Sequence, residues 1–218
     1  DNDLEYGYDE DWAYGEQLCV DFSCPYNDPY NSVDNYIRER TNGSIDIRLI
    51  SPESARIFDG STDWVAGVYL REQDEQLLRQ YGGDFTSDFD TTNQAVYGQL
   101  DLHLSQALRL SAGVRFENRK ASYNDSDLVD HRVDEDTWGG RIALQYQPSL
   151  KLMVYGLVSR GYKAGGINSN PMVAEQDREF DTEFMLNYEL GAKGRWFDDA
   201  LQAQLAMFYQ QRDDIQIK

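Results

Sequence analysis

Closely spaced acidic side chains are the first candidates for chemistry in this sequence, because carboxylates are the ligands that calcium prefers. They occur within residues 1–5 (DNDLE) and again within residues 125–130 (DSDLVD). Both segments lack the glycine at the sixth position and the glutamate at the twelfth that an EF-hand loop requires. We therefore predict solvated acidic loops at both places and no metal site.

The histidines and cysteines do not suggest a catalytic or metal centre either. A zinc site needs about four ligands, whereas His103 and His131 are isolated. No histidine-based triad pattern or phosphate-cradling loop is present, so the sequence predicts no enzyme and no cofactor. Cys19 and Cys24 lie close together in CVDFSCP. A local disulfide in a small extracellular loop is the prediction, which implies an oxidising compartment, and free thiols are the alternative.

The elements that must position any site are strands of alternating polarity. In residues 96–116 (VYGQLDLHLSQALRLSAGVRF), Leu100 and Leu102 point to one face, whereas Gln99 and Asp101 point to the other. The pattern predicts an all-β chain with about eight strands. They lie near residues 37–49, 64–71, 94–104, 108–118, 141–147, 150–159, 187–196 and 201–211.

The connections between these strands alternate between short and long. Short turns are expected at 105–107, 148–149 and 197–200, and polar excursions separate the hairpins. A meander with its turns at one end and its loops at the other is the layout of an antiparallel up-and-down transmembrane β-barrel. A soluble sandwich would show Greek-key connections and less regular loop lengths.

Charge and hydropathy limit the classes of function. The 20 basic and 39 acidic residues give a formal net charge of −19, which argues against nucleic-acid binding and against a surface built to adhere to anionic lipid headgroups. No run of about 18 apolar residues occurs, so no transmembrane helix is predicted. A barrel strand needs only about 10 residues of alternating polarity, so a membrane location stays open.

Two segments resemble the barrel of TonB-dependent outer-membrane receptors. They are LMVYGLVSRGYKAGGIN (152–168) and NYELGAKGRWFDDALQAQLAMFYQQRDDIQ (187–216). In that family a strand ending in Gly-Tyr-Lys/Arg-x-Gly-Gly precedes a long external loop. A strand with Tyr-Glu-Leu-Gly-x-Lys then enters a short periplasmic turn. SIDIRLIS and NQAVYGQLDLHL also look like barrel strands of this family, and the resemblance extends from about residue 36 onward.

The resemblance implies a domain organisation. Residues 1–35, acidic and rich in tyrosine, would form an extracellular loop, and residues 36–218 would form about eight strands of a larger barrel. Receptors of this family have 22 strands and a plugged lumen. This chain shows no plug and no TonB box, so we expect it to be an internal fragment of a larger protein.

The resemblance also implies a function. The intact protein would actively take up a scarce solute across the outer membrane of a Gram-negative bacterium. A ferric siderophore is the first candidate, and cobalamin, haem or an oligosaccharide are others. Its partners would be the TonB complex, through parts absent from this chain, outer-membrane lipid, and a small-molecule or metal-chelate substrate. The loop residues expected to contact the substrate are Tyr81, Tyr123, Asp125, Asp127, His131, Asn168 and Asn170.

Two other functions stay open at this point. The chain could be a soluble all-β carbohydrate- or ligand-binding module that uses its tyrosine-rich N-terminal region as a platform. It could also be a complete eight-stranded barrel, since eight strands are enough to close one.

Overall fold

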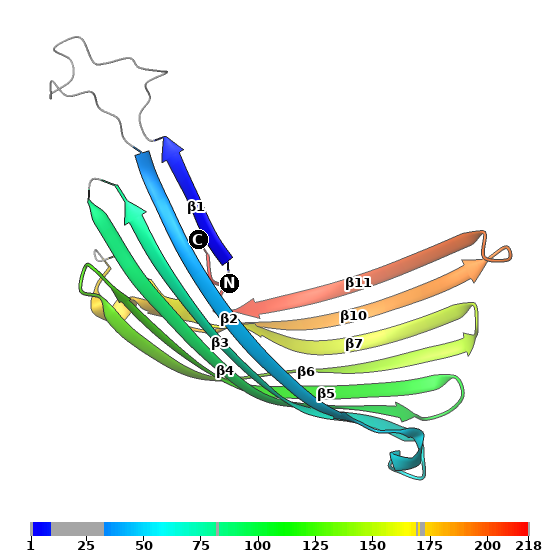
Figure 1. Cartoon of the computed structure of the whole chain (residues 1–218). Helices are drawn as coiled ribbons and strands as arrows, with labels where there is room; N and C mark the ends of the chain where they lie inside the picture. The colour runs from blue at the N-terminus through cyan, green and yellow to red at the C-terminus, as the bar shows by residue number, and fades with distance from the viewer. Residues whose placement is uncertain (1, 10–32, 82, 169, 171–172, 218) are drawn as a thin grey trace. The chain divides into compact units, whose positions relative to one another are not determined.

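The computed structural model describes residues 2–9, 33–81, 83–168, 170 and 173–217. Nine strands of this part form one sheet in the order β1-β2-β3-β4-β5-β6-β7-β10-β11, and β8 pairs with β9 separately (Figure 1). The strands of the large sheet are β1 (Asn2–Asp9), β2 (Val33–Ile50), β3 (Thr62–Gln80), β4 (Asp84–His103), β5 (Leu108–Asp125), β6 (Asp130–Ser149), β7 (Leu152–Lys163), β10 (Glu183–Trp196) and β11 (Leu201–Asp213).

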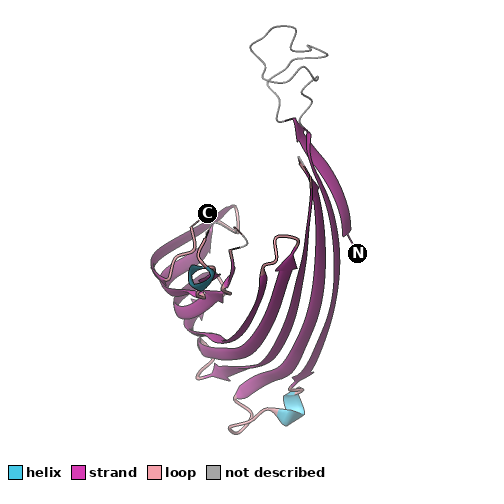
Figure 2. Ribbon diagram, turned by 90° about the vertical axis from the view of Figure 1, so that its left-hand side faces the viewer, coloured by secondary structure: helices cyan, strands magenta, loops and turns pink. Residues whose placement is uncertain are grey.

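Short elements complete the described fold. The two-residue strands β8 (Gly166–Ile167) and β9 (Glu179–Phe180) lie between β7 and β10 in the chain, together with the 3-10 turn η2 (Glu175–Asp177). A second 3-10 turn, η1 (Glu53–Ala55), follows β2, and Figure 2 shows how small these helical parts are beside the strands. None of the described helices is long and apolar enough to cross a membrane.

Where the sequence alternates in polarity, the strands place the two sets of residues on opposite faces of the sheet. In the β10–β11 pair, Leu190 lies opposite Met207 and Ala192 opposite Leu205. Asp101 and Ser111, from the other set of positions, are buried and hydrogen-bonded to each other. We call the side with Leu190 and Leu205 the apolar face of the sheet and the side with Asp101 the polar face.

No described part of the chain covers the apolar face. Leu190, Leu205 and Ile47 are 62%, 67% and 61% exposed, respectively. Only five hydrophobic residues of the described chain are buried, and most of them have small side chains: Ala95, Ala121, Tyr123, Val129 and Val133. Within the described residues, the apolar side chains of this face are therefore not packed into a protein core.

The described chain divides into two compact units. The first unit comprises residues 1–43, 72–91 and 121–132, and the second comprises residues 44–71, 92–120 and 133–218. In the second unit the apolar face ends abruptly: on β5 Phe116 is followed on the same face by Asn118, and on β6 Trp138 is preceded by Asp136. In the first unit the strands carry polar residues on both faces.

Several boundaries differ from the sequence prediction. The expected loops at 72–93 and 117–140 are mostly strand, since β3 continues to Gln80, β4 begins at Asp84, β5 continues to Asp125 and β6 begins at Asp130. Long loops at these two connections were therefore a wrong prediction. The backbone pairing continues beyond the point at which the alternation of polarity stops. A strand with polar residues on both faces has no apolar period, so the sequence pattern did not reveal it.

The N-terminal region also needs a correction. Residues 1–35 were expected to be loop, whereas Asn2–Asp9 is strand β1, paired antiparallel with β2 from Asn2↔Arg40 to Asp9↔Val33. Residues 10–32 lie outside the described part of the chain.

Candidate functional site

The polar face of the second unit carries a chain of hydrogen bonds near its centre. Asp101 accepts from the Ser111 hydroxyl, and from the Gln99 amide at 2.9 Å. Arg109 lies 3.1 Å from the same carboxylate, and Arg141 donates to the Gln99 oxygen at 3.1 Å. These side chains come from β4, β5 and β6, so the network ties neighbouring strands together across a polar surface.

A tyrosine lies across a glycine at two places on this face. On β4, Tyr97 donates to Asp46 of β2 at 2.6 Å. Its ring passes over Gly67 of the intervening strand, where an added Cβ would lie 2.4 Å from the Tyr97 Cζ. Only a glycine leaves room for this ring, and the ring in turn covers backbone that the glycine would leave bare.

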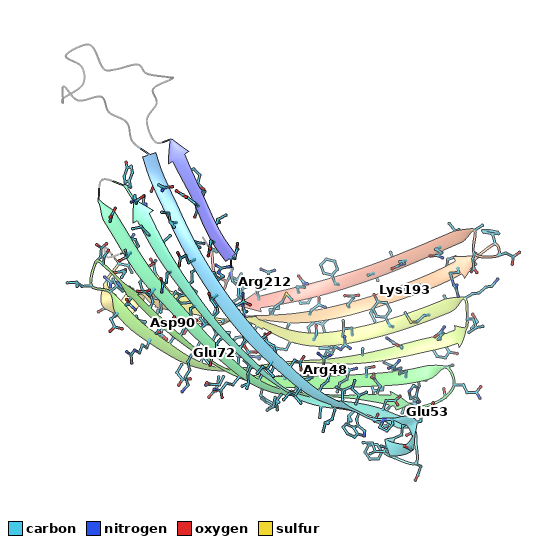
Figure 3. The ribbon with its side chains drawn as sticks, in the orientation of Figure 1. Arg48, Glu53, Glu72, Asp90, Lys193 and Arg212 are labelled. Atoms are coloured by element: carbon cyan, nitrogen blue, oxygen red, sulfur yellow. The ribbon has the colours of Figure 1, made fainter. Side chains whose placement is uncertain are left out.

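The second tyrosine–glycine pair joins β7 to β10. Tyr155 donates to Glu189 at 2.6 Å, and a Cβ at Gly191 would come within 2.4 Å of its ring. Lys193 holds its ammonium 5.8 Å from the ring centroid, and Figure 3 labels this residue on β10. Glu189 and Lys193, which both contact Tyr155, therefore lie on the polar face of β10.

Several side chains of the polar face bond to Glu117, which follows Phe116, the last apolar residue on the other face of β5. This carboxylate accepts from Asn93 at 2.7 Å, from Arg115 at 2.9 and 2.5 Å, and from the Tyr162 hydroxyl at 3.0 Å. The Arg115 guanidinium also lies 4.9 Å from the Tyr69 ring centroid. A charge held by this many donors is fixed in place rather than free to reorganise.

Glu135 anchors the connection between β7 and β10, which covers residues 164–182. One of its oxygens accepts from the Gly165 amide at 3.0 Å and from Thr182 at 2.7 Å, the two ends of the connection. The other oxygen lies 3.2 Å from Arg119. A Cβ at Gly165 would lie 2.4 Å from the same carboxylate, so the close approach requires glycine.

In the first unit, Arg79 is the centre of a charged and aromatic group on the polar face. Its guanidinium donates to both oxygens of Asp34, at 2.8 and 2.7 Å, and Asp34 is only 3% exposed. The rings of Tyr36 and Tyr81 each have their centroid 5.3 Å from the guanidinium carbon. Tyr36 also donates to Asp34 at 3.1 Å. We call Asp34, Tyr36, Arg79 and Tyr81 the Arg79 cluster.

The electrostatics of the Arg79 cluster follow from these contacts. The Arg79 guanidinium holds the pKa of Asp34 below its usual range, and Asp34 in turn raises the pKa of Arg79. Burial, followed by the hydrogen bond to Asp34, raises the pKa of Tyr36. The cluster therefore presents an ion pair with aromatic rings on either side at neutral pH.

Further aromatic and basic groups lie beside this cluster. Tyr6 of β1 stacks on Tyr36 with ring centroids 5.1 Å apart. Arg38 lies 3.3 Å from Glu75, and Arg40 donates to the same carboxylate. Counting both groups, three arginines face two carboxylates here, in a chain whose net charge is −19.

A second group of carboxylates lies elsewhere in the first unit, and the pKa of one member is raised rather than lowered. Burial raises the pKa of Asp90, as does the hydrogen bond that its protonated carboxyl donates to Asp74, and the negative charges of Asp74 and Asp88 add to this effect. Figure 3 labels Asp90 on β4. Among the described residues no group of three or more His, Cys, Asp or Glu side chains is arranged to hold a metal ion.

The predicted substrate-contact residues fall into separate places. Tyr81 is exposed beside Arg79. Tyr123 is buried on β5 and donates to Asp125 at 2.9 Å. The other Asp125 oxygen accepts from the amides of Asp127 and Val129 at 2.9 and 3.0 Å, so it closes the β5–β6 turn. These contacts give Asp125 a structural role in the turn.

The remaining candidates are located as follows. His131 lies on β6 rather than in a loop, which corrects the prediction. Asn168 accepts from the Asn170 amide at 3.0 Å, within the connection between β7 and β10. Cys19 and Cys24 lie outside the described residues, so their pairing stays a prediction. The sequence did not single out Arg79, because it lies in a stretch that was expected to be loop.

Comparisons with known proteins agree with this geometry. The family model described as "TonB dependent receptor-like, beta-barrel" matches residues 1–218. The pesticin receptor of Yersinia pestis is 30% identical over 178 residues, covering 75% of this chain and 26% of that receptor. The chain thus spans about a quarter of the length of the curated relatives it matches.

Solved structures give the same fold. The ferric yersiniabactin uptake receptor FyuA from Yersinia pestis matches with a TM-score of 0.72 and 25% identity, over 87% of this chain and 31% of that one. The siderophore receptor PiuA from Acinetobacter baumannii matches with a TM-score of 0.66 and 13% identity, over 82% and 32%. An uncovered apolar face opposite a hydrogen-bonded polar face is the cross-section that such a wall requires.

Proposed function

The chain belongs to the TonB-dependent receptor β-barrel family, and we propose from this that it is part of a receptor for active uptake of a ferric siderophore. Members of the family are transport receptors in the outer membrane of Gram-negative bacteria. The observation that carries the proposal is the likeness to the ferric yersiniabactin uptake receptor, at 25% identity over 87% of this chain. Catalysis has no place in this proposal.

Lipid would cover the apolar face and water the polar face. A charged side chain on the lipid side of a barrel costs roughly 2–4 kcal/mol at mid-membrane. Along β5 the apolar face holds Leu110, Ala112, Val114 and Phe116, whereas Arg109 and Arg115 project from the polar face. We take the first unit, polar on both faces, as a part of the receptor that contacts water rather than lipid.

The Arg79 cluster supports capture of a metal chelate. Many chelates of ferric iron carry negative charge and planar rings, which suit a guanidinium flanked by tyrosines. The surplus arginine of this region opposes the overall negative charge of the chain. Of the substrate-contact candidates, Tyr81 lies in this cluster and is therefore the first to test. Tyr123, Asp125, Asp127, His131, Asn168 and Asn170 stay candidates of lower priority.

Uptake would require the TonB complex as energy source and a plug that opens the lumen. Both are proposals for the whole receptor, because the chain spans only 26% of its curated relatives. A soluble binding module is the weaker alternative, since many large hydrophobic side chains of the described residues are exposed along one face.

A transport assay tests the proposal. A strain that lacks the full-length gene should lose uptake of radioactive iron supplied as its ferric siderophore, and the intact gene on a plasmid should restore it. Uptake of cobalamin and growth on haem should be unchanged in the same strain. Equal iron uptake with and without the gene, together with loss of cobalamin or haem use, would instead assign the receptor to that other cargo.

A further inference from the structure

The apolar face of the second unit contains a groove of about 860 Å³. Small residues on four successive strands line it: Ala66 of β3, Gly98 of β4, Ala112 of β5 and Gly140 of β6. The sheet is hollowed there because these residues have little or no side chain. Larger groups, among them Leu100, Val114, Ile142, Val158 and Leu186, complete the lining.

Two arginines line the groove, and Arg141 donates from its guanidinium to Gln99 on the polar face, which leaves Arg160 as the cation beside the groove's aromatic rings. Arg160 of β7 lines the groove, and its guanidinium lies 4.2 Å from the Trp138 ring centroid and 4.0 Å from that of Phe184. It also donates a hydrogen bond to the Trp138 carbonyl. None of the ion pairs found among the described residues involves Arg160, which distinguishes it from Arg79, Arg115 and Arg119.

The neighbours of Arg160 show where it lies relative to the end of the apolar face. Trp138 is the first residue of the apolar stretch on its face of β6, and Asp136, which precedes it on that face, accepts from Asn118 at 2.9 Å. Arg160 therefore lies at the boundary between the apolar band and the polar part of the sheet. In a membrane this is the depth of the lipid phosphates, where arginine and tryptophan side chains reach the interface.

We propose that this groove binds one acyl chain of a phosphate-bearing lipid, and that Arg160 binds its phosphate. The volume is within the roughly 300–1,000 Å³ range of small-molecule sites. A hollow on a lipid-facing wall loses dispersion contacts unless an apolar chain fills it. The planar guanidinium matches a phosphate with two parallel hydrogen bonds, and the two flanking rings fix its orientation.

The net charge of the chain is compatible with such a site. A charge of −19 argues against a surface built to adhere to anionic headgroups, as the sequence predicted. The proposed site needs only one cation, at the end of an apolar groove that supplies most of the contact. It binds one lipid in a defined place and goes beyond the uptake function.

The test is native mass spectrometry of the full-length receptor in non-ionic detergent. The receptor is titrated with dipalmitoyl phosphatidic acid or with dipalmitoylglycerol, which has the same acyl chains and no phosphate. We expect roughly tenfold tighter retention of phosphatidic acid, the size of a hydrogen bond to a charged group. Arg160→Gln should reduce this retention to that of dipalmitoylglycerol.

A second variant tests the groove itself. Ala112→Leu fills the hollow and leaves Arg160 in place, so it should weaken the retention of both lipids. The matched control is Ala192→Leu, the same change on the apolar face outside the groove, and Arg195→Gln is the control for loss of an arginine. Both controls should bind both lipids as the unaltered receptor does.

The outcomes that overturn the proposal are distinct. Equal retention of the two lipids by the unaltered receptor means that the groove is a non-selective hollow. Unchanged binding in Arg160→Gln removes the phosphate contact, and unchanged binding in Ala112→Leu removes the groove. If Arg160→Gln does not fold, as judged by loss of heat-modifiable migration, Ala112→Leu and its control decide the claim.

Discussion

Replacing Gly67 by alanine should destabilise the wall through a side chain on another strand. The new Cβ would lie 2.4 Å from the Tyr97 Cζ, whereas ordinary contact begins near 3.4 Å. The ring must therefore move by about 1 Å, which is enough to break the 2.6 Å hydrogen bond from Tyr97 to Asp46.

The size of the effect follows from that bond. A hydrogen bond to a charged group contributes about 1.5–3 kcal/mol. Asp46 is partly exposed and keeps its ion pair with Arg48, so the lower end of the range applies. Alanine also gains roughly 0.5–1 kcal/mol over glycine in a strand. The expected net loss in the free energy of unfolding is about 1 kcal/mol.

The measurement is urea-induced unfolding of the full-length receptor in detergent, followed by tryptophan fluorescence. Gly43→Ala is the matched control, because a Cβ there meets nothing within 4 Å. In a Tyr97→Ala background, Gly67→Ala should behave like this control. The reasoning is refuted if Gly67→Ala and Gly43→Ala agree within about 0.5 kcal/mol in the unaltered background.

Three further predictions concern charge and ligand contact. The raised pKa of Asp90 means that its charged form is disfavoured in the folded state, so Asp90→Asn should raise the melting temperature at pH 7. This gain should vanish below about pH 3.9, where the carboxyl is protonated in both states, and an equal gain at every pH would contradict it. Glu135→Gln should lower the free energy of unfolding by about 2 kcal/mol and speed protease cleavage within 164–182, because Arg119 loses its carboxylate; unchanged cleavage kinetics would exclude the anchoring role. Tyr81→Ala should weaken ferric-siderophore binding about threefold, the value of an exposed cation–π contact, and isothermal titration with unchanged affinity would remove Tyr81 from the site.

The sequence was sufficient for the parts of the strands that lie between an apolar and a polar environment. There the side chains alternate, as in Leu108–Phe116, and all eight expected strands are present. After Phe116, both faces of β5 are polar, so the period of two in polarity disappears although the backbone pairing continues. Strand β1 was missed for a related reason, because its acidic and tyrosine-rich residues gain strand structure from pairing with β2.

The site was less accessible to sequence reasoning. Tyr81 was chosen as a candidate because aromatic residues between strands suggest ligand contact, and its role stays a prediction. Arg79 was missed because its partner Asp34 is 45 residues away in the chain. Its signal was present, since Gln73, Glu75, Leu77 and Arg79 share one face of β3 if the stretch is treated as strand. The glycine under Tyr97 has no such signal, because only the register across strands brings the two together.

The most direct test of the account is a solvent-accessibility scan along β5 in reconstituted, full-length receptor. Nitroxide labels at single cysteines, one at a time from Leu110 to Lys120, are measured for collision with oxygen and with a water-soluble nickel complex. We predict that Leu110, Val114 and Phe116 favour oxygen, that Arg115 and Glu117 favour nickel, and that the alternation ends at Asn118. Oxygen preference at Arg115, or nickel preference at Val114, would contradict a wall with its apolar face in lipid.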